Sequence, residues 1–133
     1  MELNKEFVFE GSCLGKGILI AEDEEINYLF LNELLNASKA KVYWAQNGQE
    51  AVDIMLQHPE IVLILMDIKM PKLSGYEATR IIKESNTTVK IIATTAYAFI
   101  EDKEKALSVG CDSYVSKPIN VRVLVNEIKK VLF

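Results

Sequence analysis

The chain has 133 residues, of which 50% are hydrophobic and 26% charged, and its formal net charge at pH 7 is −4. This length suits one domain with a single core, and the composition is that of an ordinary globular protein. The acidic balance argues against direct nucleic-acid binding, which needs concentrated positive charge, and the longest apolar run, Ile61–Met66, is too short to span a membrane.

Residues 1–16 match no helix or strand pattern and are interpreted as a linker or an expression remnant before a folded domain at 17–133. They lack the apolar stretch of a signal peptide, so we expect a cytoplasmic location without membrane contact. The two cysteines, Cys13 and Cys111, have no metal-ligand spacing and are expected to stay reduced.

The folded region begins with short apolar runs that alternate with amphipathic segments. Gly17–Ala21 is expected to be a buried strand, and apolar residues at helical spacing predict a helix over Ile26–Leu35. Lys41–Ala45 is β-branched and aromatic, which favours a second strand. The next helix is expected to begin at Asn47-Gly48 and to end at His58-Pro59.

The rest of the chain continues this alternation. Ile61–Met66 is apolar throughout, which is typical of a central parallel strand buried on both faces. Ser74 and Glu77 match a capping box, which predicts a helix from there to Ser85. The remaining strands and helices are expected over Lys90–Thr94, Ile100–Val109, Ser113–Ser116 and from Asn120 onward. This alternation predicts an α/β fold, with a five-stranded parallel sheet covered by helices on both faces.

Polar residues follow four of these strands, at the edge of the sheet where open α/β proteins bind ligands. Glu22 and Asp23 follow the first strand, and Asp67 ends the third. Thr95 lies at the end of the fourth strand, and Lys117 follows the fifth. Clustered carboxylates repel one another unless a cation neutralises them, and Mg²⁺ suits oxygen ligands beside a phosphate.

These residue types predict phosphoryl transfer to a carboxylate. Asp67 is the expected nucleophile, and the metal and Lys117 would neutralise phosphoryl oxygens. The Thr95 hydroxyl would hydrogen-bond a third oxygen. Such transfer needs positioning and charge stabilisation more than covalent help from the protein.

Four blocks of sequence resemble the receiver domains of two-component signalling proteins, and they occur in the family's order within residues 17–133. The blocks are Ile-Leu-Ile-Ala-Glu22-Asp23-Glu, Leu-Met-Asp67-Ile-Lys-Met-Pro71-Lys-Leu-Ser-Gly75, Ala-Thr-Thr95-Ala96 and Tyr114-Val-Ser-Lys117-Pro118. The resemblance implies a flavodoxin-like doubly wound fold with strand order 2-1-3-4-5 and five helices.

The resemblance also implies a role for each residue of the site. Glu22 and Asp23 would hold Mg²⁺, for which Mn²⁺ would substitute, and the longer Glu22 would reach the metal through water. Asp67 would ligate the metal and take phosphate from a phosphohistidine, and the backbone carbonyl of Lys69 would complete the metal site.

Thr95 and Tyr114 are the switch pair that the resemblance implies. On phosphorylation of Asp67, Thr95 would move toward the phosphoryl oxygen and Tyr114 would turn inward. This movement would reshape the face made by the fourth helix, the fifth strand and the fifth helix. Dimerisation of phosphorylated chains through that face is left open.

Two further features follow from the resemblance. The peptide bond between Lys117 and Pro118 would be cis, which turns the lysine into the site. Lys69, Ala96 and Tyr97 lie at positions that control access of water to the phosphoaspartate. We expect the bulky Lys69 and Tyr97 to shield the phosphoryl group and to prolong its lifetime.

The chain is most similar to receivers at the C-terminus of hybrid sensor histidine kinases. Phosphate would then come from the kinase's own histidine and pass on to a histidine phosphotransfer domain, in the cytoplasmic part of a membrane-anchored sensor. The domain would phosphorylate and dephosphorylate its own Asp67 without a separate substrate, whereas the parent hybrid would be a histidine kinase. A stand-alone response regulator and an unphosphorylated interaction module are the alternatives.

A phosphohydrolase of the haloacid dehalogenase type is the enzymatic rival. Such enzymes need a second aspartate two residues after the nucleophile, where this chain has Lys69, and they usually carry a cap domain. Unphosphorylated receiver-like modules usually lack the aspartate, the lysine or an acid, all of which are present. Trp44 and Tyr76 are expected to contribute to packing.

Overall fold

A computed structural model describes residues 13–96 and 100–133. Its centre is a sheet of five parallel strands in the order β2-β1-β3-β4-β5. The strands are β1 (Gly17–Ala21), β2 (Lys41–Ala45), β3 (Ile61–Asp67), β4 (Lys90–Thr95) and β5 (Ser113–Ser116). The predicted fold class and strand order are confirmed.

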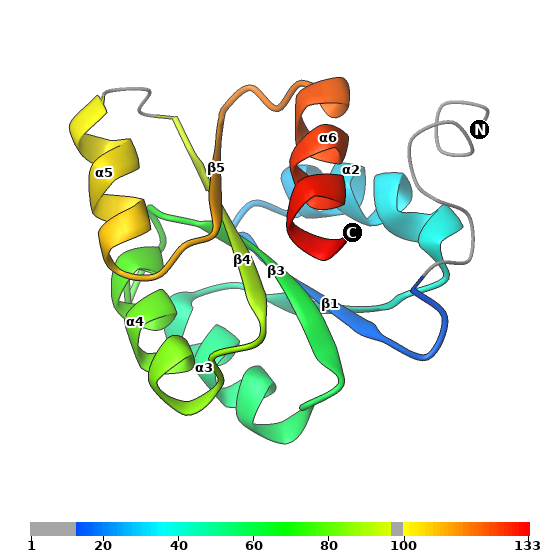
Figure 1. Ribbon diagram of the computed structural model, residues 1–133, viewed down its shortest axis with the longest axis horizontal. Helices are drawn as coiled ribbons and strands as arrows, with labels where there is room; N and C mark the ends of the chain where they lie inside the picture. Colours follow the sequence, from blue (N-terminus) through cyan, green and yellow to red (C-terminus); the bar gives the residue numbers. More distant parts are fainter. Residues whose placement is uncertain (1–12, 97–99) are drawn as a thin grey trace.

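Helices cover both faces of the sheet (Figure 1). One face carries α3 (Gly48–Gln57), α4 (Gly75–Ser85) and α5 (Ile100–Ser108), and the other carries α2 (Glu25–Leu35) and α6 (Val121–Leu132). The chain runs outward from β1 to β2 and returns to β3, so the strand order reverses between β1 and β3. None of the helices in the described ranges has the length and apolar composition needed to cross a membrane.

The central strand β3 supplies both halves of the core. Leu63 and Leu65 point into the apolar cluster beneath α2 and α6, whereas Ile64 and Met66 point into the cluster beneath α3, α4 and α5. This alternation is the two-residue period of a strand that is buried on both faces. Burial of each such side chain contributes about 1.5–3 kcal/mol, so the strand that ends at Asp67 is firmly anchored.

Side-chain caps start three of the helices at the residues that the sequence predicts. Asn47, Ser74 and Asn120 each accept a hydrogen bond from the backbone N–H three residues later, at 2.9, 3.2 and 3.1 Å. The carboxylate of Glu77, the expected partner in the capping box, pairs with Arg80 at 2.8 Å. These caps fix where the loops at the carboxyl edge of the sheet end.

The strand ends differ from the prediction by one residue where it matters for the site. β3 extends to Asp67 and β4 extends to Thr95, so both polar residues lie inside the strand ladder. The expected ranges, Ile61–Met66 and Lys90–Thr94, stop one residue earlier. A short 3₁₀ helix, Asn36–Ser38, follows α2 and was not predicted, and α5 ends at Ser108 instead of Val109.

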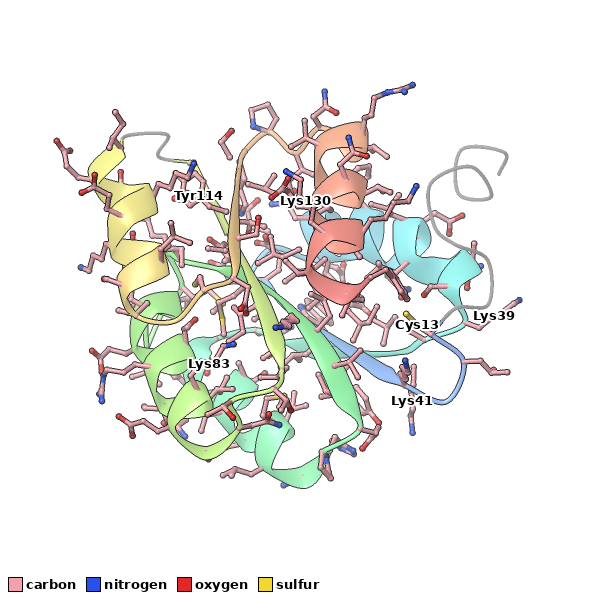
Figure 2. The ribbon with its side chains drawn as sticks, in the orientation of Figure 1. Cys13, Lys39, Lys41, Lys83, Tyr114 and Lys130 are labelled. Carbon is pink, nitrogen blue, oxygen red and sulfur yellow. The ribbon has the colours of Figure 1, made fainter. Side chains whose placement is uncertain are left out.

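Residues 13–16 are attached to the domain. Cys13 is buried against the cluster beneath α2 and α6 (Figure 2), and its N–H donates to the carbonyl of Ser38 at 2.9 Å. The carbonyl of Lys16 accepts from the N–H of Lys41 at 2.9 Å. Residues 1–12 lie outside the described part of the chain, so the linker there stays a prediction.

Candidate functional site

Three carboxylates meet at the carboxyl edge of the sheet, where the strand order reverses. Oxygen atoms of Glu22, Asp23 and Asp67 lie within 4.8 Å of one another. Glu22 and Asp23 follow β1, and Asp67 ends the neighbouring strand β3. Parallel strands bring these residues together because their carboxyl ends share one edge.

Lys117 places its ammonium between two of the carboxylates. Its Nζ donates to Oε1 of Glu22 at 2.9 Å and to Oδ2 of Asp67 at 3.1 Å. The backbone N–H of Lys117 donates to the carbonyl of Thr95 at 2.7 Å, which ties the lysine to the end of β4. The peptide bond between Lys117 and Pro118 is cis, the isomer that the sequence resemblance implies.

The loop after β3 is folded tightly around Asp67. The backbone N–H of Lys69 donates to Oδ1 of Asp67 at 3.1 Å, and the N–H of Gly75 donates to the carbonyl of Ile68 at 2.9 Å. A Cβ at Gly75 would lie 2.3 Å from the carbonyl oxygen of Asp67. Only glycine allows this approach, so the start of α4 is fixed against the strand that carries Asp67.

Burial governs the electrostatics of the site. Glu22 is 1% exposed and Asp67 is 5% exposed, and this burial raises the pKa of both carboxyl groups against the opposing effect of Lys117. Burial alone would lower the pKa of the Lys117 ammonium, but its contacts with Glu22 and Asp67 outweigh burial and raise the pKa. The raised pKa values show that the ammonium of Lys117 offsets only part of the cost of burying these two carboxylates.

The site opens to solvent through a cavity of about 340 Å³. Its lining combines acidic, basic and small residues, which are Asp23, Glu24, Asn27, Asp67, Lys69, Ala96 and Lys117. Asp23 is exposed, whereas Asp67 reaches the cavity from the buried end of β3. A small anion can therefore approach Asp67 from solvent.

The donor set fits a hard divalent cation. Three carboxylates within 4.8 Å supply the oxygen ligands that Mg²⁺ and Mn²⁺ prefer, and an excess of negative charge that a cation would offset. Asp23 and Asp67 both line the cavity, so a bound ion would have access to water. The acidic cluster that the sequence predicts for Mg²⁺ is therefore present at this edge of the sheet.

The proposed switch residues lie on adjacent strands. Thr95 ends β4 and is buried, and Tyr114 lies in β5, half-buried against the cluster beneath α3, α4 and α5 (Figure 2). Ala96 lines the cavity beside Asp67. Tyr97, predicted to control access to the phosphate, lies outside the described residues.

Trp44 is expected from the sequence only to pack, and the hydrogen bond that its side chain makes was missed. Its indole Nε1 donates to the backbone carbonyl of Glu22 at 2.8 Å, and its ring stacks on Tyr28 with centroids 4.2 Å apart. No pattern of residue types reveals this contact, because the acceptor is a backbone atom.

An apolar face on α2 borders the site and was also missed. Ile26, Leu29 and Phe30 are 79%, 53% and 43% exposed, although their helical spacing predicts a buried stripe. Ile26 and Phe30 line an open groove of about 300 Å³ that includes Lys117 and Ile119. The groove connects exposed apolar residues to the lysine that contacts Asp67.

Comparisons with known proteins by sequence and by structure identify relatives of the same family. Residues 18–129 match the family model described as the response regulator receiver domain. The polar-differentiation response regulator DivK of Brucella anthropi is 38% identical over 120 residues, which cover 88% of this chain and 96% of DivK.

Two solved structures extend the comparison. One is a co-crystal structure of the Saccharomyces cerevisiae histidine phosphotransfer protein Ypd1 with the receiver domain of Ssk1, with 36% identity and a TM-score of 0.78 over 86% of this chain and 87% of the other. The other is the receiver domain of a signal transduction histidine kinase from Syntrophus aciditrophicus. It has 28% identity and a TM-score of 0.76, over 88% of this chain and 89% of the other.

Proposed function

The chain belongs to the response regulator receiver domain family of two-component signalling, and from this premise we propose that it accepts a phosphoryl group on Asp67 from a phosphohistidine. The observation that carries the proposal is the placement of Asp67 beside Glu22 and Asp23, with its Oδ2 3.1 Å from Lys117 Nζ. An Asp67 carboxylate oxygen would form a bond to phosphorus as the bond from phosphorus to the donor's imidazole nitrogen breaks. The domain turns over no separate substrate in this scheme.

The residues around Asp67 have complementary roles in the proposal. Lys117, already bound to Asp67, would hold a phosphoryl oxygen, and the hydroxyl of Thr95 would hydrogen-bond another. Glu22, Asp23, Asp67 and the carbonyl of Lys69 would hold Mg²⁺ or Mn²⁺, which supplies neutralising charge for the phosphoryl oxygens.

Access of water to the phosphoaspartate would depend on the rim of the cavity. Lys69 and Ala96 line the cavity together with Asp67. We assign Lys69, together with Tyr97, the role of shielding the phosphoryl group. Substitution Lys69→Asn should then shorten the phosphate lifetime, measured by the decay of the phosphorylated mass, and an unchanged decay would remove Lys69 from this role.

The signal would leave the domain through α5, β5 and α6. Thr95 and Tyr114 lie on the adjacent strands β4 and β5, so a shift of Thr95 toward the phosphoryl group would open space for the ring of Tyr114. Tyr114 is half-buried against the cluster that includes Ala106 of α5, so inward movement of its ring changes that face. The proposal includes association of two phosphorylated chains through this face.

The phosphodonor would dock on the apolar face of α2. Ile26 and Phe30 line the groove that includes Lys117, so a protein bound there would bring its phosphohistidine to the Asp67 cavity. Receiver domains interact with histidine phosphotransfer proteins, as in the Ypd1 complex with Ssk1. We propose a histidine kinase or a histidine phosphotransfer domain as the partner.

The protein that contains this domain has two proposed arrangements. The match along 96% of DivK favours a single-domain response regulator. A hybrid kinase is the other proposed arrangement, and it rests on the sequence resemblance to receivers of hybrid sensor histidine kinases. The full reading frame distinguishes them, because a hybrid requires a kinase core before this domain.

Intact mass spectrometry after incubation with acetyl phosphate and Mg²⁺ tests the proposal. The wild-type chain should gain one phosphoryl group, and the gain should vanish in Asp67→Asn and when EDTA replaces Mg²⁺. The exposed Asp53 on α3 offers a matched control, since Asp53→Asn should leave the adduct intact. An adduct that persists in Asp67→Asn would overturn the assignment of Asp67.

A further inference from the structure

Glu22 lies at the point where the chain leaves β1 and where the strand ladder ends. Its N–H still donates to the carbonyl of Ala45 on β2, at 2.9 Å. Its carbonyl accepts instead from the indole Nε1 of Trp44, at 2.8 Å. The side chain of Trp44, on the edge strand β2, thus adds one hydrogen bond beyond the last residue pair of β1 and β2.

The indole is itself held in place from the other side. Trp44 stacks on Tyr28 of α2, with ring centroids 4.2 Å apart and ring planes 6° apart. The N–H of Tyr28 donates to the carbonyl of Glu24 at 3.0 Å, within the first turn after the acidic pair. Trp44 therefore connects β2 to both ends of the short segment that carries Glu22 and Asp23.

The carboxylate of Glu22 is oriented by two further hydrogen bonds. Its Oε2 accepts from the backbone N–H of Glu24 at 3.1 Å, and its Oε1 accepts from Lys117 Nζ at 2.9 Å. With the backbone N–H and carbonyl also bound, every polar group of Glu22 has a partner. Loss of the indole bond would free the carbonyl and allow the peptide between Glu22 and Asp23 to rotate.

We propose that Trp44 is a positioning residue, whose indole N–H fixes the Glu22 carbonyl and thereby holds the acidic pair in the geometry that binds Mg²⁺. This inference rests on the proposed function, because it takes Glu22, Asp23 and Asp67 as the metal site. Metal sites depend on hydrogen bonds that orient their ligands, and Mg²⁺ demands a closely defined arrangement of oxygens. Trp44 acts through Glu22 and does not touch the cavity.

The test is the Mg²⁺ affinity of Trp44→Phe, measured by calorimetric titration of the unphosphorylated chain. Phenylalanine keeps a ring to stack on Tyr28 but has no N–H to donate. We expect the dissociation constant for Mg²⁺ to rise about fivefold, the equivalent of one net hydrogen bond of about 1 kcal/mol. Tyr28→Phe is the matched control, since it keeps both the stacking and the indole N–H, and its affinity should equal that of the wild type.

A second measurement uses the wild-type chain, which contains a single tryptophan. The ¹H–¹⁵N signal of the indole N–H should shift on addition of Mg²⁺ and saturate with the same dissociation constant as the calorimetric titration. Urea unfolding in EDTA gives the stability of each variant, so that affinities are compared only where the chains are folded.

The outcomes separate this inference from the proposed function. An unchanged Mg²⁺ affinity in Trp44→Phe, or an equal loss in Tyr28→Phe, would overturn the role of the indole N–H while leaving the metal site intact. A wild-type chain that binds no Mg²⁺ would overturn the proposed metal site and the positioning role together.

Discussion

The ammonium of Lys117 lies 3.1 Å from Oδ2 of Asp67, although fifty positions separate the two residues in the chain. The same ammonium lies 2.9 Å from Oε1 of Glu22. One cation thus serves two buried carboxylates, and Asp23 adds a third negative charge nearby. The arrangement is suited to binding cations and phosphoryl oxygens. Burial of the two ionised carboxylates also lowers the free energy of unfolding.

Replacement of Asp67 by asparagine should therefore stabilise the metal-free domain. Burial makes the ionised Asp67 carboxyl unfavourable even beside Lys117, and the amide keeps its shape without the charge. We expect the free energy of unfolding in urea, with EDTA at neutral pH, to rise, because the raised pKa of Asp67 means that its ionised form opposes folding above that pKa. Asp53→Asn on the exposed side of α3 should change it little. A lower stability for Asp67→Asn than for the Asp53 variant would contradict this account.

Substitution Gly75→Ala should disturb the site through the backbone. The new Cβ would lie 2.3 Å from the carbonyl oxygen of Asp67 and 2.7 Å from Cα of Ile68, and backbone atoms cannot move aside without shifting β3 or α4. We expect a loss of about 2–3 kcal/mol in the free energy of unfolding. Glu84→Ala, at an exposed position of the same helix, should cost less than about 0.5 kcal/mol. Equal stabilities for the two variants would show that the loop adapts freely.

If the phosphodonor protein docks on the apolar face of α2, a substitution there should affect docking without affecting phosphorylation of Asp67. Ile26→Ala should slow phosphoryl transfer from a histidine phosphotransfer protein about tenfold, the effect of about 1.4 kcal/mol of lost contact. The rate with acetyl phosphate should not change, since that small donor needs no docking face. Leu56→Ala removes a side chain that is 68% exposed on α3, on the other face of the sheet, and serves as the control. Equal losses with both donors would assign Ile26 to the site itself.

The switch predicts a coupled response of Thr95 and Tyr114. Beryllofluoride with Mg²⁺ should shift the NMR signals of both residues in the wild-type chain, because it occupies the place of the phosphoryl group. In Thr95→Ala the ring of Tyr114 should stay in its resting position, whereas Thr88→Ala, at an exposed position before β4, should respond like the wild type. Unchanged spectra in the wild-type chain would count against a two-state switch.

The sequence was sufficient for the fold because strong local patterns agreed with one another. Apolar runs such as Ile61–Met66 and side-chain caps such as Asn47 and Ser74 specify the elements, and their alternation specifies a parallel sheet. The meeting of Glu22 with Asp67 follows from the same topology, since Glu22 follows β1 and Asp67 ends the neighbouring parallel strand β3.

Two features could not be predicted from residue patterns: the hydrogen bond from a side chain to a backbone carbonyl, and the exposure of an apolar side chain. The indole of Trp44 binds a carbonyl, and every residue has one, so no residue type marks the acceptor. Ile26 has the spacing of a core position, yet it lies in the first turn of α2 and its side chain is 79% exposed. Periodicity identifies the residues that share a helix face, but it does not specify how much of that face the rest of the fold covers.

Borohydride trapping of the phosphorylated chain tests the central claim most directly. Borohydride reduces an acyl phosphate to an alcohol, so a phosphorylated aspartate becomes homoserine, and peptide mass spectrometry then identifies the residue. After incubation with acetyl phosphate and Mg²⁺, we predict homoserine at position 67 and unmodified Glu22 and Asp23. Homoserine at another aspartate, or a phosphorylated chain that yields none at position 67, would contradict the assignment of Asp67 as the phosphoryl acceptor.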